Sequence, residues 1–281
     1  KLRGTLLYLD MPSHTGTENL MMGAALAEGE TIIENASVEP EVVDFGNFLL
    51  KMGAKIEGLG THTLIIQGVK QLNAVEYKPM PDRLVIGALT MATAIVGGDI
   101  TMQGAEPRHL RLVNAKLEQM GVQISTTPDT IRVRRDPDKP LNPINITTHP
   151  YPGFPTDLQP CIAALATVSV GKSYIRERIF ENRYDFVDGL IKMGADAIIS
   201  QNDVCIINGV TGLVGTRVRA ASIRAGAALL LGSIAAEGET IIENGYQIDR
   251  GHEAIEDQLT SLGAVVERIE TTPAPAVAPI L

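Results

Sequence analysis

The hydrophobic and polar positions of this chain follow one plan that is repeated four times. Each repeat has an apolar Ala/Gly-rich segment, a glycine, a short strand pattern, a polar corner, an amphipathic segment, a second glycine and further strand patterns. The two glycines of a repeat lie 24, 23, 23 and 25 residues apart, and the second glycines follow one another after 68, 73 and 69 residues. This regular spacing predicts a fold built from repeated units. The glycine pairs are Gly29 and Gly53, Gly98 and Gly121, Gly171 and Gly194, and Gly238 and Gly263.

The two helices predicted in each repeat differ in pattern. The first is apolar on nearly every side and should be buried, whereas the second has one apolar face and should lie outside. Each second glycine fits the left-handed residue that follows a helix. Buried helices are predicted at 20–27, 84–95 and 225–236, and amphipathic helices at 41–52, 110–120, 186–193 and 254–262. Strands are predicted at 63–67, 131–134, 204–207 and 265–269.

Repeated units that each place a buried helix under a sheet predict a quasi-symmetric α/β domain. One unit cannot bury its own apolar helix, so about three units are needed to close a core. Units two to four, residues 78–270, can form such a domain, and the first unit, residues 1–77, is left without partners. The chain starts at Lys1 in mid-pattern, so we expect a missing N-terminal segment, a second subunit, or both to cover residues 1–77. Residues 271–281 are Pro/Ala-rich and predicted to be a disordered tail.

Composition narrows the classes of function. A net charge of −9 argues against a nucleic-acid or membrane-surface binder. No signal peptide and no membrane-spanning run is visible. Two cysteines, Cys161 and Cys205, suggest a reducing compartment, in keeping with a cytoplasmic protein. The five histidines have no metal-binding spacing, so no metal site is predicted.

The main candidate residue lies in the stiff loop 151–159, which reads Tyr-Pro-Gly-Phe-Pro-Thr-Asp-Leu-Gln. Thr156 and Gln159 fit a capping box, which predicts that a helix begins here. Asp157 would then lie in the first helical turn, where the helix dipole favours its charged form. A carboxylate held in this way can orient or deprotonate a substrate hydroxyl. Asp157 could equally do no more than cap the helix, and its residue type leaves both roles open.

Seven motifs occur in order along residues 1–269. They are 9–22, 33–36 with 39–41, 81–83, 152–159, 180–183, 224–228 and 248–251, the first reading Leu-Asp-Met-Pro-Ser-His-Thr-Gly-Thr-Glu-Asn-Leu-Met-Met. Together they resemble the UDP-N-acetylglucosamine enolpyruvyl transferases. This resemblance implies two domains of three units each, an inside-out α/β barrel pair with the active site between them. The chain would then hold the last four of six βαβαββ-type units.

The resemblance also implies an activity: transfer of the enolpyruvyl group of phosphoenolpyruvate to the 3′-hydroxyl of UDP-N-acetylglucosamine, the first committed step of peptidoglycan synthesis. It implies no metal and no organic cofactor. Asp157 matches the aspartate at the sugar 3′-hydroxyl, and Arg183, Arg224 and Arg250 match arginines around phosphoenolpyruvate. Guanidinium groups bind carboxylates and phosphates in this way, although they also form weak surface ion pairs. The implied substrate-binding residues are Ser13, His14, Thr15, Thr17, Asp157, Ile179 and Arg83.

Several positions carry an alternative. A helix that Thr15 and Glu18 could cap would offer its first amides to the nucleotide. Cys161 and Cys205 are expected to be inert core thiols, since the family's active cysteine belongs to the missing portion. At Ser222 the family usually has an aspartate that assists proton movement, and serine cannot supply that charge. A set of four polar residues matches the lining of the cleft or forms corner salt bridges: Glu39, Glu41, Asp82 and Arg83.

Three functions therefore stay open. The first is the nucleotide-sugar enolpyruvyl transferase, with this chain truncated and inactive alone. The second is the sister reaction, 5-enolpyruvylshikimate-3-phosphate synthesis. The third is a non-catalytic paralogue that binds a UDP-sugar, which Ser222 and the missing third of the family chain would favour.

Overall fold

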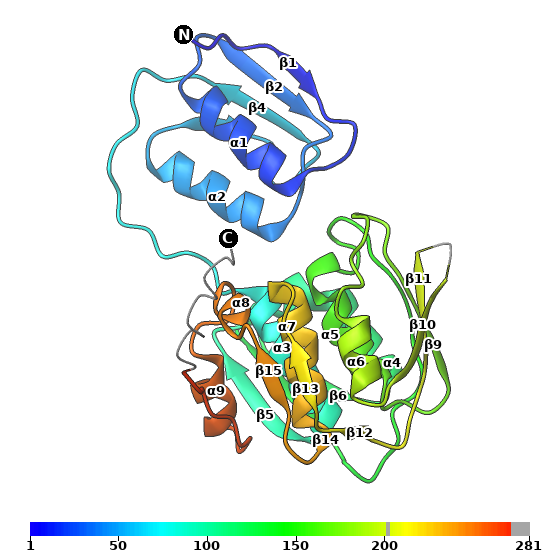
Figure 1. Ribbon diagram of the computed structural model, residues 1–281. Coiled ribbons are helices and arrows are strands. Elements are labelled where there is room, and N and C mark those ends of the chain that lie inside the picture. Colours follow the sequence, from blue (N-terminus) through cyan, green and yellow to red (C-terminus); the bar gives the residue numbers. More distant parts are fainter. Residues whose placement is uncertain (201–202, 271–281) are drawn as a thin grey trace, which may run out of the picture.

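The computed structural model describes residues 1–200 and 203–270, so the tail predicted at 271–281 lies outside the described residues. Two lobes are joined by residues 68–82, which contain no helix or strand (Figure 1). The upper lobe holds the first unit. The lower lobe holds the other three. Each lobe has its own hydrophobic core.

The first unit has the full βαβαββ order. Its elements are β1 (Leu6–Tyr8), α1 (His14–Ala25), β2 (Glu30–Glu34), α2 (Pro40–Lys51), β3 (Lys55–Glu57) and β4 (Thr63–Gln67). The sheet has the order β1-β2-β4-β3, in which β1 and β2 are parallel and both β2 and β3 run antiparallel to β4. The third unit repeats this arrangement as β8-β9-β11-β10.

The lower lobe contains the remaining elements. Unit two has α3 (Arg83–Val96), β5 (Gly98–Gln103), η1 (Pro107–Leu110), α4 (Arg111–Gln119), β6 (Gln123–Thr126) and β7 (Thr130–Arg135). Unit three has β8 (Asn145–Thr147), η2 (Thr156–Leu158), α5 (Gln159–Ala166), β9 (Lys172–Arg176), α6 (Val187–Lys192), β10 (Asp196–Ser200) and β11 (Val204–Asn208). Unit four has β12 (Leu213–Val214), β13 (Arg217–Arg219), α7 (Ile223–Ile234), β14 (Ala236–Glu237), β15 (Ile241–Glu243), α8 (Tyr246–Asp249) and α9 (Ile255–Ser261).

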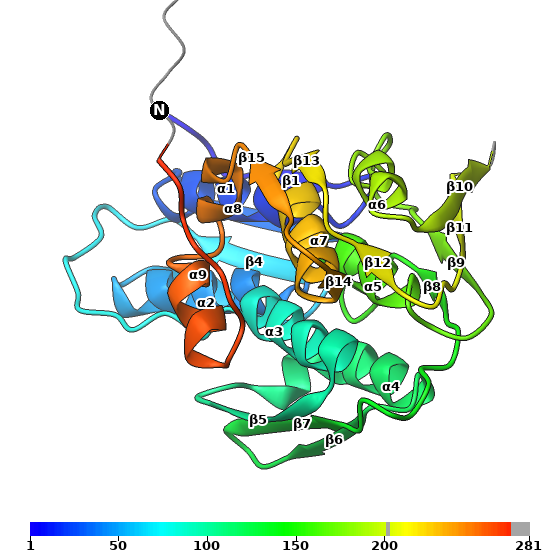
Figure 2. The same cartoon turned by 60° about the horizontal axis from the view of Figure 1, so that its bottom comes forward.

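The apolar helices lie inside the lower lobe and the sheets lie outside. Helices α3, α5 and α7 contact one another, and Figure 2 shows them in the middle of the lobe with β5–β7 below and β8–β11 to the right. Every residue of α5 is buried. The α/β class and the buried helices are therefore as predicted. Helices inside and sheets outside also fit the expected inside-out arrangement, although among the described residues the strands form separate sheets rather than one closed barrel.

The predicted element boundaries are mostly confirmed. Strand β4 has the predicted bounds, and α3 and α7 lie within a few residues of theirs. Helix α1 begins earlier than expected, at His14, because the preceding Ser13 caps it. The strand predicted at 265–269 is wrong. Within the described range, residues 264–270 form no strand, and Val265 is fully exposed because no neighbouring strand edge lies beside it.

Every unit has a left-handed residue after its outer helix and another in the corner before that helix. The glycine after each outer helix has a φ of 101°, 97°, 95° and 101°, as predicted for Gly53, Gly121, Gly194 and Gly263. The polar corner before each outer helix also contains one: Asn35, Gly104, Asn182 and Asn244, with φ values of 57°, 74°, 54° and 59°. Asparagine and glycine tolerate this conformation best. Asn35, Gly104 and Asn244 each lie six residues after the first glycine of their unit, whereas Asn182 lies eleven residues after Gly171, so units one, two and four share this corner turn and unit three has a longer corner.

Candidate functional site

Asp157 lies where units three and four meet. It belongs to the single turn η2, which leads directly into α5. Arg183 Nη1 donates a hydrogen bond to Asp157 Oδ1 at 2.8 Å, and Arg224 Nη1 lies 3.6 Å from the same oxygen. Arg183 comes from the corner after β9, and Arg224 comes from the first turn of α7. The structure thus brings together three of the four predicted catalytic residues, a carboxylate and two guanidinium groups.

Arg183 is held on several sides. Its side chain is only 13% exposed, its Nη1 also donates to Thr156 Oγ1 at 3.1 Å, and its guanidinium carbon lies 4.1 Å from the centre of the Phe180 ring. A cation over an aromatic face is stabilised by the ring quadrupole. Arg183 therefore has one fixed orientation toward Asp157.

The capping box predicted for Thr156 and Gln159 is wrong. The Thr156 hydroxyl donates instead to Glu177 Oε2 at 2.8 Å, and Gln159 is fully buried at the start of α5. Asp157 nevertheless lies in a helical first turn, although this turn is a 3₁₀ turn.

Arg250 is separate from this group in the part of the chain that is described. It caps the end of α8, is exposed, and donates from Nη1 to Gln247 Oε1 at 3.2 Å. Its neighbour Gly251 packs closely on the start of α7, where an added Cβ would lie 2.4 Å from Ile223 Cδ1. Arg250 thus lies beside the helix start that carries Arg224, but within the described residues it forms no ion pair with Asp157.

Two predicted substrate-binding residues in unit one serve the local fold. Ser13 caps α1 by accepting from the Gly16 amide at 3.2 Å. Thr17 is fully buried, and its hydroxyl donates to the Ser13 carbonyl and accepts from the Ser37 amide. The predicted cap by Thr15 and Glu18 is wrong, because Ser13 occupies that position and Glu18 instead lies 3.2 Å from His14 Nε2.

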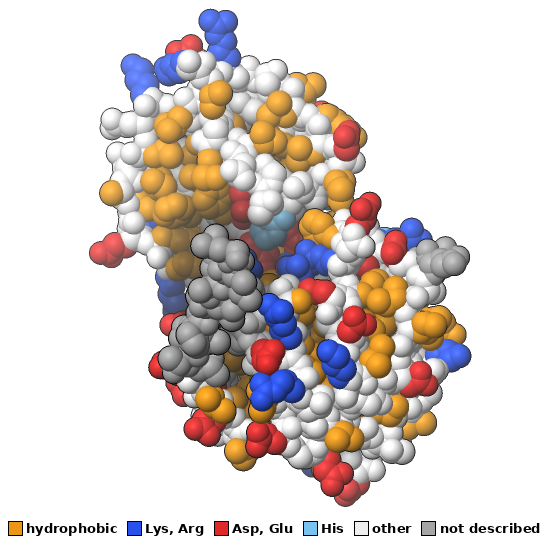
Figure 3. Space-filling model, viewed as in Figure 1, with side chains coloured by type: hydrophobic (Ala, Val, Ile, Leu, Met, Phe, Trp, Pro, Cys, Tyr) orange, Lys and Arg blue, Asp and Glu red, His pale blue; other side chains and the backbone are white. Residues whose placement is uncertain are grey.

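His14 and Thr15 remain open to a ligand. Both stand at the start of α1, where the first backbone amides have no partner within the helix. Thr15 is exposed, and His14 lines a cavity of about 550 Å³ between the two lobes. In the space-filling view a histidine and several charged side chains lie at this junction (Figure 3). Other lining residues include Glu41, Phe48, Tyr77 and Asp82.

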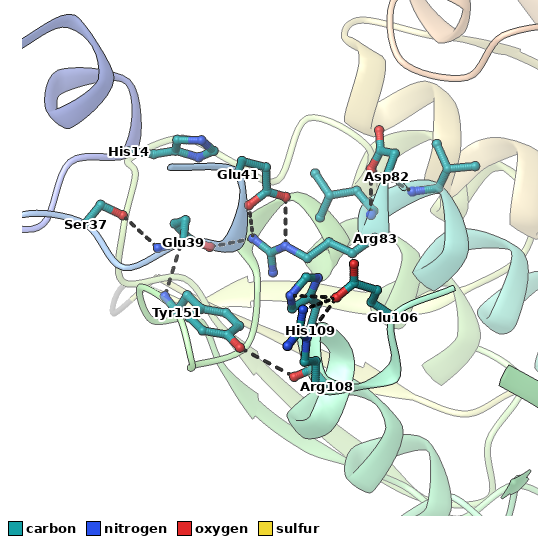
Figure 4. A network of polar contacts seen from close by, with 12 residues as sticks. His14, Ser37, Glu39, Glu41, Asp82, Arg83, Glu106, Arg108, His109 and Tyr151 are labelled. Carbon is teal, nitrogen blue, oxygen red and sulfur yellow. Dashed lines mark hydrogen bonds and ion pairs between the residues drawn. The ribbon is translucent and has the colours of Figure 1, made fainter. Parts of the chain in front are cut away.

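Arg83 connects the two lobes, as Figure 4 shows. It forms ion pairs with Glu39 and Glu41, and its guanidinium lies 5.5 Å from the centre of the Tyr151 ring. The Tyr151 amide donates to Glu39 Oε1 at 3.1 Å. Burial acts to lower the pKa of Arg83, but the hydrogen bond and charge of Glu41 outweigh it, so the pKa is raised.

Arg83 has a structural role between the lobes, and its predicted role in substrate binding stays a prediction. Its side chain is only 6% exposed, and its Nε and Nη2 groups donate to the two glutamates. Asp82 caps α3 by accepting from the amides of Leu84 and Val85. The corner salt bridge, the alternative for this set, is what the structure contains.

The hydroxyl of Ser222 is hydrogen bonded to a carboxylate of the neighbouring unit. Ser222 caps α7, accepting from the Ala225 amide at 3.1 Å, and its hydroxyl donates to Asp185 Oδ2 at 2.7 Å. Asp185 belongs to the same corner as Arg183. Nothing in the sequence marked Asp185, because the contact joins residues of two different units.

The remaining predicted residues are placed as follows. Ile179 is half-buried, and its amide donates to Glu177 Oε1 at 2.8 Å. Cys161 and Cys205 are buried free thiols, and burial raises the pKa of each to about 12, which makes them poor nucleophiles. Among the described residues, no group of three or more His, Cys, Asp or Glu side chains is arranged to hold a metal. No helix in the described ranges is long and apolar enough to cross a membrane.

Comparison with known proteins gives a consistent assignment. Residues 1–259 match the family described as EPSP synthase (3-phosphoshikimate 1-carboxyvinyltransferase). The chain is 51% identical over 271 residues to a UDP-N-acetylglucosamine 1-carboxyvinyltransferase of Thermobifida fusca and 47% identical over 269 residues to that of Magnetococcus marinus. These alignments cover 96% of this chain but only 63% and 64% of the relatives.

Solved structures agree on the fold. The enolpyruvyl transferase NikO from Streptomyces tendae has a TM-score of 0.81 at 25% identity, covering 94% of this chain and 65% of that one. An EPSP synthase from Acinetobacter baumannii, at 17% identity, shares the fold with a TM-score of 0.72 over 96% of this chain and 64% of its own. The repeated α/β units, the arginine-flanked Asp157 and these matches lead to one conclusion: the chain belongs to the EPSP synthase (3-phosphoshikimate 1-carboxyvinyltransferase) family.

Proposed function

We propose that the protein transfers the enolpyruvyl group of phosphoenolpyruvate to the 3′-hydroxyl of UDP-N-acetylglucosamine, and so acts in peptidoglycan synthesis. The observation that carries this proposal is the Asp157 carboxylate, flanked by Arg183 and Arg224 at 2.8 Å and 3.6 Å in a chain 51% identical to an enzyme of that name. In the absence of a substrate, the two guanidinium groups neutralise Asp157. When a substrate is bound, the two guanidinium groups can form ion pairs with its anionic groups instead.

The proposed roles follow from charge. Asp157 accepts the proton of the sugar hydroxyl, whose oxygen then bonds to the central carbon of phosphoenolpyruvate. Arg183, Arg224 and Arg250 hold the carboxylate and phosphate, and they stabilise the phosphate as it leaves, an electrostatic task. The amides that begin α1 at His14 and Thr15 contact the nucleotide, and the main chain of Ile179 contacts the sugar. At the position of Ser222 the family usually has an aspartate, and here the carboxylate of Asp185, which accepts a hydrogen bond from Ser222, takes its role.

We also propose the division into domains. Residues 1–77 are the last unit of one domain, and residues 78–270 form a three-unit domain. The exposed apolar side chains of unit one support the idea that further chain or a second subunit covers it. These side chains are Leu2, Leu6, Tyr8, Met11, Met22 and Leu26, each between 45% and 70% exposed. The two reduced thiols support a cytoplasmic location.

Calorimetry provides the first test. The 281-residue chain is titrated with UDP-N-acetylglucosamine and with shikimate 3-phosphate. We expect binding of the UDP-sugar, weakened in the Arg224→Ala variant. A preference for shikimate 3-phosphate would instead assign the sister reaction, which the name of the matching family keeps as the second candidate.

A chimera tests catalysis. The N-terminal third of the Thermobifida fusca relative is joined to this chain, and phosphate release is measured with both substrates present. We expect phosphate release, and a loss of about 100-fold or more in the Asp157→Asn variant, because a general base contributes roughly that factor. A chimera that binds the UDP-sugar and releases no phosphate would favour the non-catalytic paralogue.

A further inference from the structure

Glu177 is a buried carboxylate directly behind the site. It follows the last residue of β9 and is only 4% exposed. Its Oε1 accepts from the amides of Arg178, Ile179 and Phe180 at 3.1, 2.8 and 3.2 Å. Oε1 also accepts from the hydroxyl of Thr148 at 2.8 Å, and Oε2 accepts from the hydroxyl of Thr156 at 2.8 Å.

These hydrogen bonds satisfy a polar side chain at this depth. Within the described residues, no Lys or Arg side chain forms an ion pair with Glu177. Three successive amides and two hydroxyls donate to its two oxygens instead. Its backbone is also fixed, because the Glu177 amide donates to the hydroxyl of the buried Tyr184 at 3.0 Å.

The two oxygens of Glu177 hold two different parts of the site. Oε1 fixes the turn that presents Ile179. Oε2 fixes Thr156, whose own oxygen accepts from Arg183 Nη1 at 3.1 Å, and that same nitrogen binds Asp157. A single side chain therefore determines how far the Asp157–Arg183 pair lies from the main chain of Ile179.

We propose that Glu177 is a positioning residue, which sets the separation between the Asp157–Arg183 pair and Ile179 so that both contact one sugar ring. This inference rests on the proposed function for the identity of the ligand. Displacements of about 1 Å at a reacting centre can cost on the order of 100-fold, so accurate spacing has a large effect.

Glu177→Gln is the central variant. It keeps the size of the side chain but replaces one acceptor oxygen with an NH₂ group, which cannot accept from the surrounding donors. We expect UDP-N-acetylglucosamine to bind about 10- to 100-fold more weakly, as measured by calorimetry. Ser173→Ala is the matched control, because Ser173 is a fully buried residue of the same strand whose oxygen accepts from the Ile144 amide, away from the site. The affinity of Ser173→Ala for UDP-N-acetylglucosamine should stay within about twofold of the parent value, even though this variant loses a buried hydrogen bond.

A cycle with Thr156→Val tests the route of the effect. If Glu177 acts through Thr156 and Arg183, the loss of affinity in the double variant should equal that of Glu177→Gln alone. Fully additive losses would overturn the proposed route. So would a Glu177→Gln variant that loses thermal stability to the same extent as Ser173→Ala while keeping its affinity.

An NMR measurement separates this inference from the proposed function. The side-chain Nε–Hε signal of Arg183, assigned with an Arg183→Lys variant, is recorded without ligand. It should move in Glu177→Gln and in Thr156→Val, and stay in place in Ser173→Ala. Should the parent chain bind no UDP-sugar, the proposed function fails, and the Arg183 signal still decides whether Glu177 positions the pair. An unmoved signal in Glu177→Gln would refute the positioning role.

Discussion

Met22 and Met91 occupy the same place in two copies of one unit, seven residues before the first repeat glycine, yet their environments are opposite. Met22 in α1 is 47% exposed, and Met91 in α3 is fully buried. Helix α1 buries four residues out of 12, whereas α5 buries all eight of its own. An apolar pattern alone therefore does not bury a helix. Burial requires the neighbouring copies.

Local interactions, by contrast, are alike in the two regions. Ser13 and Ser222 each lie 16 residues before the first glycine of their unit, and each caps its helix by accepting from the amide three residues on. The corner asparagines and the glycines after the outer helices also share their backbone conformations. The two lobes therefore differ in tertiary burial and agree in local structure.

The largest expected effect is on the buried methionine. Met91→Ala should lower the free energy of unfolding by about 2–5 kcal/mol, because it leaves a cavity among α3, α5 and α7. Met22→Ala should change it by less than about 0.5 kcal/mol. Chemical denaturation of the 281-residue chain measures both. Equal losses would mean that α1 is covered in solution, and the comparison between the lobes would be broken.

The junction between the lobes should show the next largest effect. Arg83→Met leaves Glu39 and Glu41 without their cation, and we expect a loss of about 2 kcal/mol, below the roughly 3–5 kcal/mol of a fully buried pair because Glu41 is a quarter exposed. The upper lobe should then unfold in a separate, earlier transition. Arg132→Met, which removes the exposed pair with Asp99 in the β5–β7 sheet, is the control and should leave a single transition unchanged.

The helix caps should behave alike in the two lobes. Ser13→Ala and Ser222→Ala should each cost about 1 kcal/mol, the usual value of such a cap. Ser222→Ala should cost slightly more, since its hydroxyl also binds Asp185. Thermal unfolding of both variants provides the measurement. A loss of stability in Ser222→Ala alone would show that burial, rather than the capping hydrogen bond, determines the size of the loss.

The smallest effect concerns pH and the buried histidine His252. Burial lowers the pKa of His252 below its usual 6.5, and the charge of Asp82, in another unit, opposes this shift. The folded state therefore binds a proton less readily than the unfolded state. The stabilisation is complete above pH 6.5 and is lost as the pH falls through the lowered pKa.

We therefore expect the midpoint of thermal unfolding to fall between about pH 7 and pH 5, and His252→Gln to reduce that slope. His149→Gln, at an exposed position, is the control and should keep the slope of the parent. An unchanged slope in His252→Gln would place the acid sensitivity elsewhere.

Much of the fold was predictable, since repeat spacing, apolar helices and strand patterns are local. The predictions failed where a distant partner was needed. The pattern at 265–269 has the composition of a strand, but no strand edge lies beside it in the described chain. The capping box at Thr156 did not form, because the Thr156 oxygen accepts from Arg183 and its hydroxyl donates to Glu177, 27 and 21 residues away.

The site was predicted in part for the same reason. Motif resemblance singled out Asp157, Arg183 and Arg224, and the structure brings them together. It gave no hint of Glu177, whose partners Thr148 and Thr156 lie 29 and 21 residues away in the same unit, or of Asp185, which contacts Ser222 of the next unit. It also treated Arg83 and Thr17 as open to substrate, although both side chains are buried.

The sequence by itself determined the four units, their helices and turns, and the residue types able to hold an anion, because these depend on neighbours along the chain. Only the tertiary structure decided which helices are buried, which acids face which arginines, and which polar side chains are free for a ligand. Burial and charge pairing depend on surfaces from different units meeting, and a periodic pattern repeated four times cannot say which copies meet.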